Sequence, residues 1–365
     1  MICVAVTDRP ESVSIVLFAL GWCAGWVLLW RPRPLPRETV GRCRASVSVV
    51  VPARNEAGSI GALAASVVSQ LRDGDELVVV DDHSSDDTAA IARSSGAAVV
   101  TAPALPTGWA GKPHACHTGA SSTSGDLLVF VDADVCLGEG DLDRIAAAVT
   151  AHPGDIVSVQ PWHHAVRPFE QCSMPFNIVA LMGSGAFTPA GDRVSPRVAF
   201  GPVIALTRAR YREIGGHAHA SVRSAVLEDI ALARRVERTR LHTGSSGATT
   251  FRMYPTRLAS LVEGWTKGIA IGFDATPWWA ALGTAAWVAS VLGGWVTSPW
   301  FALASTVQMA VLARRAGSFR WYAVIGAPLL MVFFIVVFVR SLVLRRFRRS
   351  VTWKGRTVRP DQEVG

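Results

Sequence analysis

Apolar residues are distributed very unevenly along this chain of 365 residues, and this restricts its fold more than any other feature. Three nearly uncharged segments, 277–296, 299–313 and 321–339, follow one another near the C-terminus, and another, 13–30, lies near the N-terminus. An apolar helix of about 18 residues or more is long enough to cross a bilayer. We therefore expect a globular part combined with membrane helices.

The charges on either side of the segment 13–30 predict its orientation in the membrane. Asp8 and Glu11 precede the segment 13–30 and the basic stretch "RPRPLPR" follows it, which is the reverse of a cleaved signal peptide. We interpret residues 1–31 as an N-terminal transmembrane anchor, and residues 32–45 as a stiff, proline-rich linker on the cytoplasmic side.

The C-terminal segments are harder to orient. Three crossings within 277–343 would leave the basic tail 344–365 outside the cell, against the usual excess of Arg and Lys in the cytoplasm. The middle segment is short and contains Gln308, so we expect two effective crossings, with that segment as a re-entrant piece; the alternative is three crossings, with a tail that breaks the charge trend. Residues 256–276, which precede them, are predicted to form an interfacial segment.

Residues 46–255 have the pattern of one α/β domain. Short β-branched runs alternate with Ala-rich stretches such as 57–72 and 86–94, and the runs are predicted strands at 46–52, 76–82, 97–103 and 126–134. Strands that alternate with helices favour a parallel sheet covered by helices on both faces.

Charge and cysteine content narrow the class of protein. The net charge of +8 is carried almost wholly by arginine and gathers beside the apolar segments, which indicates contact with membrane lipid and no nucleic-acid partner. The six cysteines include no C-x-x-C pair, as expected for reduced thiols of a protein facing the cytosol. His114, Cys116 and His117 lie too close together in sequence for a zinc site.

Acidic residues follow two of the predicted strands. Asp81 and Asp82 end one strand, and Asp132 and Asp134 end another. The carboxyl ends of parallel strands meet at one edge of an open sheet, where ligands bind. Carboxylates that converge there repel one another unless they bind a cation, and oxygen ligands suit Mg²⁺ or Mn²⁺.

Other acidic residues have a plain structural explanation. Asp86 and Asp87 precede a helical stretch, and we expect them to cap that helix. Asp81 and Asp82 could be a polar turn only, and a single D-x-D occurs by chance in many chains. From the residues alone, Glu228 and Asp229 stand at the start of an amphipathic helix and indicate nothing further.

Several motifs in order resemble family 2 glycosyltransferases of the GT-A fold. They are "VSVVVPARNEAGSI", "VVVDDHSSDDT", "GWAGKPHACHTGA", "LLVFVDADV" and "VLEDIALARRV". The resemblance covers about residues 46–270, and "FGPVIALTRARYREIGG", "EGWTKG" and "TWKGR" make it similar to the membrane-bound branch that includes carotenoid- and hopanoid-associated enzymes. It implies a Rossmann-like nucleotide-sugar-binding domain between N- and C-terminal transmembrane helices.

The resemblance also implies which residues hold the donor. Pro52 and Glu56 match positions that line the nucleotide pocket. Asp82 matches the aspartate that reads the base, with Asp81 beside it. Lys112 is implied to lie near the base or the diphosphate.

The remaining implied roles belong to the reaction centre. Asp132 matches a position near the ribose and the metal, and Asp134 the ligand of a divalent metal, Mg²⁺ or Mn²⁺. Asp229 matches the catalytic base of an inverting transfer, with Glu228 next to it. A base on the face opposite the leaving group takes the acceptor proton, and one displacement inverts the anomeric centre.

One motif of the processive members is missing. They carry Q-x-x-R-W on an interfacial helix, where this chain reads "LVEGWTKGIA". This favours a single transfer over polymer synthesis. We expect Trp265 and Lys267 to close the donor site, with Lys267 toward phosphate; the alternative is that Lys267 only reaches the membrane edge.

These observations predict a bacterial, multi-pass enzyme of the cell membrane with a cytoplasmic catalytic domain. It would move a hexosyl group from a nucleotide sugar, UDP- rather than GDP-linked, to a lipid or amphiphilic acceptor. The nearest alternative is a polyprenyl-phosphate glycosyltransferase, for which the anion-binding candidates are Arg193, Arg197, Arg208 and Arg210.

A second alternative is a non-catalytic membrane nucleotide-binding, scaffold or transport protein, although residues 277–313 lack the intramembrane charge that transport favours. We interpret His163 and His164 as a pair that is either solvated or on the acceptor side. The stretch Gly183–Ser184–Gly185 is interpreted as a flexible loop on the acceptor side.

Overall fold

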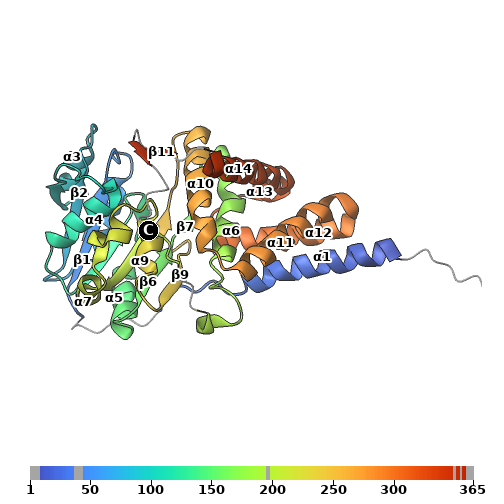
Figure 1. The fold of residues 1–365 in the computed structure, drawn as a ribbon, viewed down its shortest axis with the longest axis horizontal. Coiled ribbons are helices and arrows are strands. Elements are labelled where there is room, and N and C mark those ends of the chain that lie inside the picture. Colours follow the sequence, from blue (N-terminus) through green and yellow to red (C-terminus); the bar gives the residue numbers. More distant parts are fainter. Residues whose placement is uncertain (1–8, 37–43, 195–197, 348–350, 354–355, 359–365) are drawn as a thin grey trace, which may run out of the picture.

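A seven-stranded sheet in the order β3-β2-β1-β4-β8-β6-β9 lies at the centre of the globular part (Figure 1). The computed structural model describes residues 9–36, 44–194, 198–347, 351–353 and 356–358, so Arg197 and parts of the linker 32–45 and tail 344–365 lie outside the described residues. The strands are β1 (Val47–Ala53), β2 (Glu76–Asp81), β3 (Ala98–Thr101), β4 (Leu127–Val131), β6 (Ile156–Gln160), β8 (Val203–Thr207) and β9 (Thr239–Thr243).

The expectation of a parallel sheet is correct for one side of the sheet, from β3 to β4. Strands β3, β2, β1 and β4 are parallel, but β8 runs antiparallel to both β4 and β6. Strand β9 is again parallel to β6 and forms the open edge. The fold is therefore a mixed α/β sheet, in which β8 runs against both of its neighbours.

Helices cover both faces of this sheet, as predicted. One face packs against α2 (Ile60–Val68), α3 (Thr88–Ser94) and α5 (Asp141–Ala151). The other face packs against α4 (Gly111–Ser121), α7 (Arg208–Glu213), α8 (Ala220–Arg223) and α9 (Glu228–Ala233). The strands β1, β2 and β4 are buried on both sides, which explains their nearly continuous apolar sequences.

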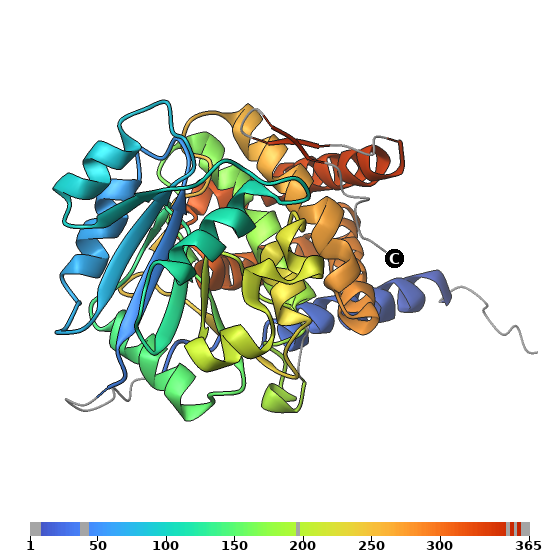
Figure 2. The ribbon, with the colours of Figure 1, turned by 60° about the vertical axis from the view of Figure 1, so that its left-hand side comes forward.

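Three long helices extend away from the sheet and lie side by side (Figures 1 and 2). They are α1 (Arg9–Leu28), α11 (Trp278–Thr297) and α12 (Pro299–Ala316). Gly25 of α1 lies against the indole of Trp287 so closely that an added Cβ would come within 2.3 Å of it. Large side chains such as Leu20, Leu282 and Leu303 remain exposed on the outside of this bundle.

Gln308 explains how the short middle segment belongs to the bundle. Its side chain is fully buried, accepts a hydrogen bond from Nε1 of Trp287 (2.9 Å) and donates one to the carbonyl of Trp22 (2.7 Å). The segment expected to be re-entrant is therefore a full partner of α1 and α11. Buried polar groups that bond across helices are characteristic of packing between membrane helices.

The last apolar segment forms α13 (Trp321–Ile325) and α14 (Ala327–Phe347). Arg320 N donates to Gln171 of η1 (Pro168–Ser173), and Ser341 Oγ donates to the carbonyl of Thr266, so both ends contact the globular part. By length and hydropathy, the helices of the described residues that could cross a membrane are Trp278–Thr297 and Ala327–Leu344, whereas the apolar part of α1, Ser14–Leu28, is shorter.

Smaller elements connect the sheet with these helices. Helices α10 (Leu258–Gly272) and α6 (Met174–Gly183) lie between them, and α10 packs along α14 (Figure 1). The other elements are β5 (Val135–Cys136), β7 (Trp162–His163), β10 (Thr250–Phe251), β11 (Val351–Trp353), β12 (Arg356–Val358), η2 (Gly191–Arg193), η3 (Gly216–Ala218) and η4 (Phe273–Ala275).

Candidate active site

The carboxyl ends of β2, β1 and β4 meet at one edge of the sheet, as the sequence predicted. Ala53 pairs with Asp81 across β1 and β2, and Asp132 directly follows β4. Asp81 and Asp82 are both buried. Arg54 donates to the carbonyl of Asp82 at 2.8 Å, and its Nη1 lies 3.6 Å from the carboxylate Oδ2 of the same residue.

Pro52 and Glu56 lie on the β1 side of this edge. Pro52 pairs with Val80 of β2, and Glu56 stands in the loop that leads to α2. The Glu56 carboxylate accepts a hydrogen bond from Ser59 Oγ (3.1 Å), and its backbone N donates to Thr88 Oγ1 (2.8 Å). The loop after β1 is thus fastened to the start of α3.

The predicted helix cap is provided by one aspartate only. Asp86 accepts hydrogen bonds from the backbone N of Thr88 (3.1 Å) and of Ala57 (3.2 Å). Asp87, the residue directly before α3, makes no side-chain capping bond. Its predicted capping role is therefore wrong, because the turn directs the Asp86 carboxylate toward the free N–H groups.

A bridging lysine lies at the centre of the site. Lys112, the second residue of α4, has its Nζ 2.7 Å from Oδ1 of Asp132 and 2.7 Å from Oε1 of Glu228. Glu228 is the first residue of α9 and is buried. The ammonium thus joins the end of β4 to the beginnings of two helices that are far apart in the sequence.

Asp229 lies next to this bridge, and one of its two carboxylate oxygens is left without a hydrogen bond among the described residues. The carboxylate is buried, and Oδ1 has no hydrogen-bond partner within the described part of the chain. Gly201 lies against it, since an added Cβ there would be 3.0 Å from Oδ2. The neighbouring Pro202 carbonyl accepts from the N of Asp132 (2.9 Å), so residues 201–202 hold the two aspartates near each other.

The two adjacent carboxyl groups on α9 titrate differently. Burial and the charge of Glu228 raise the pKa of Asp229 to about 7. Burial also acts to raise the pKa of Glu228, but the ammonium of Lys112 outweighs it and the pKa is lowered. Two neighbouring carboxyls with pKa values pushed apart can serve as a charged ligand and as an acid–base group.

Asp134 is half-buried, and Tyr254 lies near it. Burial, with the charges of Asp134 and Asp132, raises the pKa of the Tyr254 phenol. Tyr254 has a backbone φ of +53°, which is uncommon for a residue with a large side chain. Its ring lies against Gly264 of α10, where an added Cβ would come within 2.1 Å of it.

Helix α10 presents Lys267, and not Trp265, toward the carboxylates. Burial lowers the pKa of Lys267, although Glu228, Asp229 and Asp132 are near enough to act against this. Trp265 is buried, stacks on Phe176 at 5.0 Å and donates to Ser173 Oγ (3.1 Å). The indole therefore anchors α10, and the part of Trp265 in closing the donor site stays a prediction.

A divalent cation suits this group of side chains. Asp229 has a buried oxygen without a hydrogen-bond partner among the described residues, and burial together with the charge of Glu228 raises its pKa. Within the described residues no group of three or more His, Cys, Asp or Glu side chains is close enough to ligate one ion. An ion held by Asp132 and Asp134 would need further oxygens from a ligand, as Mg²⁺ usually does.

Two of the arginines expected to bind an anionic acceptor, Arg208 and Arg210, lie away from this site. Arg208 is buried and donates to the carbonyls of Gly125 and Ala120 (2.8 Å), and Arg210 pairs with Glu213 at 2.8 Å. Both follow β8, which is antiparallel to β4, so they lie at the opposite edge of the sheet.

Two unassigned groups prove to be structural. His163 is fully buried, and its ring stacks on Phe319 at 5.6 Å, so the expectation of a solvated histidine is wrong for it and holds for exposed His164. Ser184 is the buried C-cap of α6, and Trp279 packs within 2.6 Å of the Cβ position of Gly185. The predicted flexible loop is therefore a packed helix end.

Sequence reasoning missed Tyr254 and His217. His217 is buried, lies 3.0 Å from the Tyr211 hydroxyl through Nδ1, and has a pKa lowered to about 4 by burial, with Glu228 and Lys112 among its charged neighbours. It supports the cluster as a neutral side chain. The Tyr–Pro pair at 254–255 favours an extended backbone with negative φ at Tyr254, so the sequence carries no signal of its φ of +53°.

The chain is similar in sequence to a known protein family and to named proteins. Residues 48–174 match the family described as Glycosyl transferase family 2. The 4,4'-diaponeurosporenoate glycosyltransferase of Staphylococcus haemolyticus (strain JCSC1435) is 32% identical over 376 residues, covering 95% of this chain and 98% of that protein. The protein of the same name from Staphylococcus aureus (strain USA300) is 31% identical, covering 95% and 97%.

Among solved structures, a mannosyltransferase from Pyrobaculum calidifontis in complex with GDP-Man and Mn²⁺ is similar in fold. The TM-score is 0.54 at 18% identity, and the alignment covers 92% of this chain and 99% of that one. The similarity therefore extends beyond the sheet to most of the chain.

Proposed function

The chain belongs to glycosyl transferase family 2, and from this premise we propose that it transfers a sugar from a nucleotide-sugar donor to a carotenoid-type acceptor at the cytoplasmic face of a bacterial membrane. Its relatives over nearly the whole length carry the name of a carotenoid-acid glycosyltransferase. The observation that carries the proposal is the arrangement of Lys112, Asp132, Glu228 and Asp229 at the carboxyl ends of the strands.

The nucleotide occupies the side of the edge formed by β1 and β2. The buried Asp81 and Asp82 supply acceptors for the base, and Pro52 and Glu56 form the neighbouring wall. Strand β4 lies two strand positions from β2, roughly 10 Å away, a distance that a ribose and diphosphate can span. We expect a UDP- rather than a GDP-sugar.

The diphosphate lies over the end of β4. Asp134 and Asp132 would hold Mg²⁺ or Mn²⁺, which when bound neutralises the charge that gathers on the leaving diphosphate. Lys112 is already placed at Asp132 and exchanges part of that contact for a phosphate oxygen. Lys267, the half-buried ammonium on α10, provides the second positive group when the donor is bound.

Asp229 serves as the general base. Its pKa of about 7 lets it accept a proton from an acceptor hydroxyl near neutral pH, as that oxygen attacks the anomeric carbon. The new glycosidic bond forms as the bond to the diphosphate breaks, and the proton remains on Asp229. One displacement of this kind inverts the anomeric centre. Glu228 stays ionised and holds Lys112 in place.

The acceptor approaches from the side of the long helices. The packed core beneath α10 is continuous with α14 through Trp265 and Phe334, and the outer surfaces of α11 and α14 are apolar. An apolar carotenoid chain would remain in the bilayer while its polar end reaches the carboxylates. The hairpin of α11 and α12, with both its ends at the globular part, would return the chain to the cytoplasmic side.

The alternative of a polyprenyl-phosphate acceptor gains no support from the described arginines that were expected to form its anion site. Arg208 and Arg210 are engaged elsewhere, and Arg193 is exposed near η2. The alternative of a non-catalytic scaffold or transport protein does not fit a member of an enzyme family that retains the motif carboxylates.

The test uses the full chain purified in detergent. Binding and hydrolysis of UDP- and GDP-sugars are measured with Mn²⁺, Mg²⁺ or EDTA, and transfer is measured with a hydroxylated carotenoid and, beside it, a carotenoid carboxylic acid, which is already ionised near neutral pH. Asp134→Ala should abolish metal-dependent donor binding, whereas Asp229→Asn should bind donor and lose transfer to the hydroxylated carotenoid by about 10²-fold or more. Asp73→Asn, an exposed carboxylate in the turn before β2, is the matched control.

Two outcomes would contradict parts of the proposed function. A folded protein that binds no nucleotide sugar with either metal contradicts the donor assignment. Donor binding without transfer to the carotenoid acid, but with transfer to a polyprenyl phosphate, favours the second acceptor class.

A further inference from the structure

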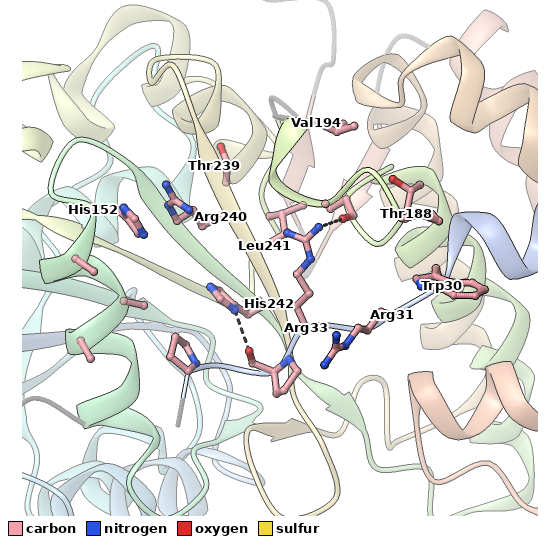
Figure 3. A pocket seen from close by; sticks show the side chains of 18 residues that line it. Trp30, Arg31, Arg33, His152, Thr188, Val194, Thr239, Arg240, Leu241 and His242 are labelled. Carbon is pink, nitrogen blue, oxygen red and sulfur yellow. Dashed lines mark hydrogen bonds between the residues drawn. The ribbon is translucent and has the colours of Figure 1, made fainter. Parts of the chain in front are cut away.

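A second pocket lies on the far edge of the sheet. It has a volume of about 750 Å³ and is formed by the chain that follows α1, the edge strand β9, the end of α5 and the segment 186–191 (Figure 3). That volume is within the range of small-molecule sites. The donor and acceptor chemistry described above does not use it.

This pocket is separate from the carboxylate cluster. Strands β8 and β6 stand between β4, which carries Asp132, and β9. Three strand spacings amount to roughly 14 Å. None of the residues that line the pocket is a member of the proposed donor site or of the catalytic cluster.

Its lining is basic. Arg31, Arg33, Arg240, His152 and His242 contribute to the walls, and within the described residues no Asp or Glu lines it. Two of the arginines are partly committed: Arg240 pairs with Asp155 at 2.7 Å, and Arg33 donates to the carbonyl of Ala186 at 3.1 Å (Figure 3). Arg31 is exposed and has no ion-pair partner in the part of the chain that the structure describes.

One wall of the pocket is continuous with the membrane helices. Trp30 lies two residues beyond the end of α1 and is 57% exposed. Val27 and Leu20 of the helix are also exposed. Exposed tryptophans at the end of an apolar helix mark the level of the lipid headgroups. Arg31 is therefore at this level, and its backbone N is held by the carbonyl of Phe187 (3.2 Å).

From this placement we propose that the pocket binds the phosphodiester headgroup of an anionic phospholipid of the cytoplasmic leaflet. Arginines on a rigid backbone suit a phosphate group, and the anionic leaflet supplies one at this depth. The linker is fastened to the edge strand, since Thr243 N donates to the carbonyl of Arg33 at 2.7 Å. A bound headgroup would thus hold β9 and the globular part against the bilayer.

The inference rests on the membrane association in the proposed function, but it needs neither donor nor acceptor. It is tested on the full chain in a non-ionic detergent by native mass spectrometry, with phosphatidylglycerol or phosphatidylcholine of the same acyl chains. Wild type should retain phosphatidylglycerol in preference. Arg31→Gln should lower that retention roughly fivefold and leave phosphatidylcholine unchanged.

Arg320→Gln is the matched control, because Arg320 is an exposed arginine beside the exposed Trp321 but does not line the pocket. Arg31→Gln/Arg33→Gln should lower retention further. Equal losses in Arg31→Gln and Arg320→Gln, or equal retention of the two lipids by wild type, would overturn the proposal. So would binding of soluble glycerol phosphate that displaces no phosphatidylglycerol. Donor hydrolysis, measured in parallel, separates this failure from a failure of the proposed function.

Discussion

The Nζ of Lys112 lies 2.7 Å from Oε1 of Glu228, although α4 and α9 are separated by more than a hundred residues of sequence. Through the same atom Lys112 also reaches Asp132. This contact lowers the pKa of Glu228, while Asp229, the next residue, keeps a raised one. The division of roles between the two carboxyls of "LED" therefore depends on a lysine from another motif.

Removing the Lys112 ammonium tests its two proposed roles, which are to pair with Glu228 and to bind the donor. Lys112→Met should lower the unfolding free energy by about 1–3 kcal/mol, because it leaves the buried Glu228 carboxylate without its partner. The lower part of that range is expected, since the Lys112 side chain is 36% exposed. The donor Kd should also rise. Thermal unfolding and donor titration measure the two effects, and Lys112→Arg is the control that keeps the charge.

The pH dependence of transfer should follow Asp229. Because the base must be ionised, kcat/KM should rise with pH through a midpoint near 7 and then level off. Glu228→Gln should move this midpoint to lower pH, since the charge of Glu228 raises the pKa of Asp229. Excess metal should lower the midpoint of wild type and that of Glu228→Gln, and the midpoint of the variant should remain the lower of the two. A midpoint that stays in place or rises in Glu228→Gln would contradict the assignment of Asp229 as base.

Asp229 should also make the folded protein less stable at neutral than at acidic pH. Its pKa is raised on folding, so its contribution to stability is complete below its unfolded pKa of roughly 4 and is lost as the pH rises toward 7. Asp229→Asn removes this loss. At pH 8 the variant should unfold at a higher temperature than wild type, by roughly 2–4 °C for each kcal/mol of unfolding free energy that the substitution restores. At pH 4 the difference in unfolding temperature should vanish. The control Asp73→Asn should show no such dependence on pH.

Tyr254 should connect α10 to Asp132 and Asp134, the aspartates proposed to bind the metal. Gly264→Ala places a methyl group within 2.1 Å of the Tyr254 ring and should displace either the ring or α10. We expect a higher KM for the donor and a lower unfolding temperature. Tyr254→Ala in the same chain should recover part of the unfolding temperature, because the clash is gone, but not the KM. Full recovery of both would show that Tyr254 has no part in donor binding.

The sequence alone determined the α/β pattern, the positions of the strand ends and the meeting of Asp81, Asp82 and Asp132 at one edge. These features depend on local periodicity and on the geometry common to parallel strands, both of which can be read from neighbouring residues. The motifs likewise pointed to Lys112 and Asp229 before any contact between them was known.

The tertiary structure decided which of those side chains face the site. Trp265 and Arg208 looked available in sequence, but packing against Phe176 and bonding to the carbonyls of Gly125 and Ala120 commit them elsewhere. Gln308 looked out of place in a span, yet it bonds to two other helices. Such outcomes depend on partners distant in the chain, whose burial and hydrogen bonds are set only when the whole core closes. For the same reason the raised pKa of Asp229 belongs to the folded protein and not to its sequence.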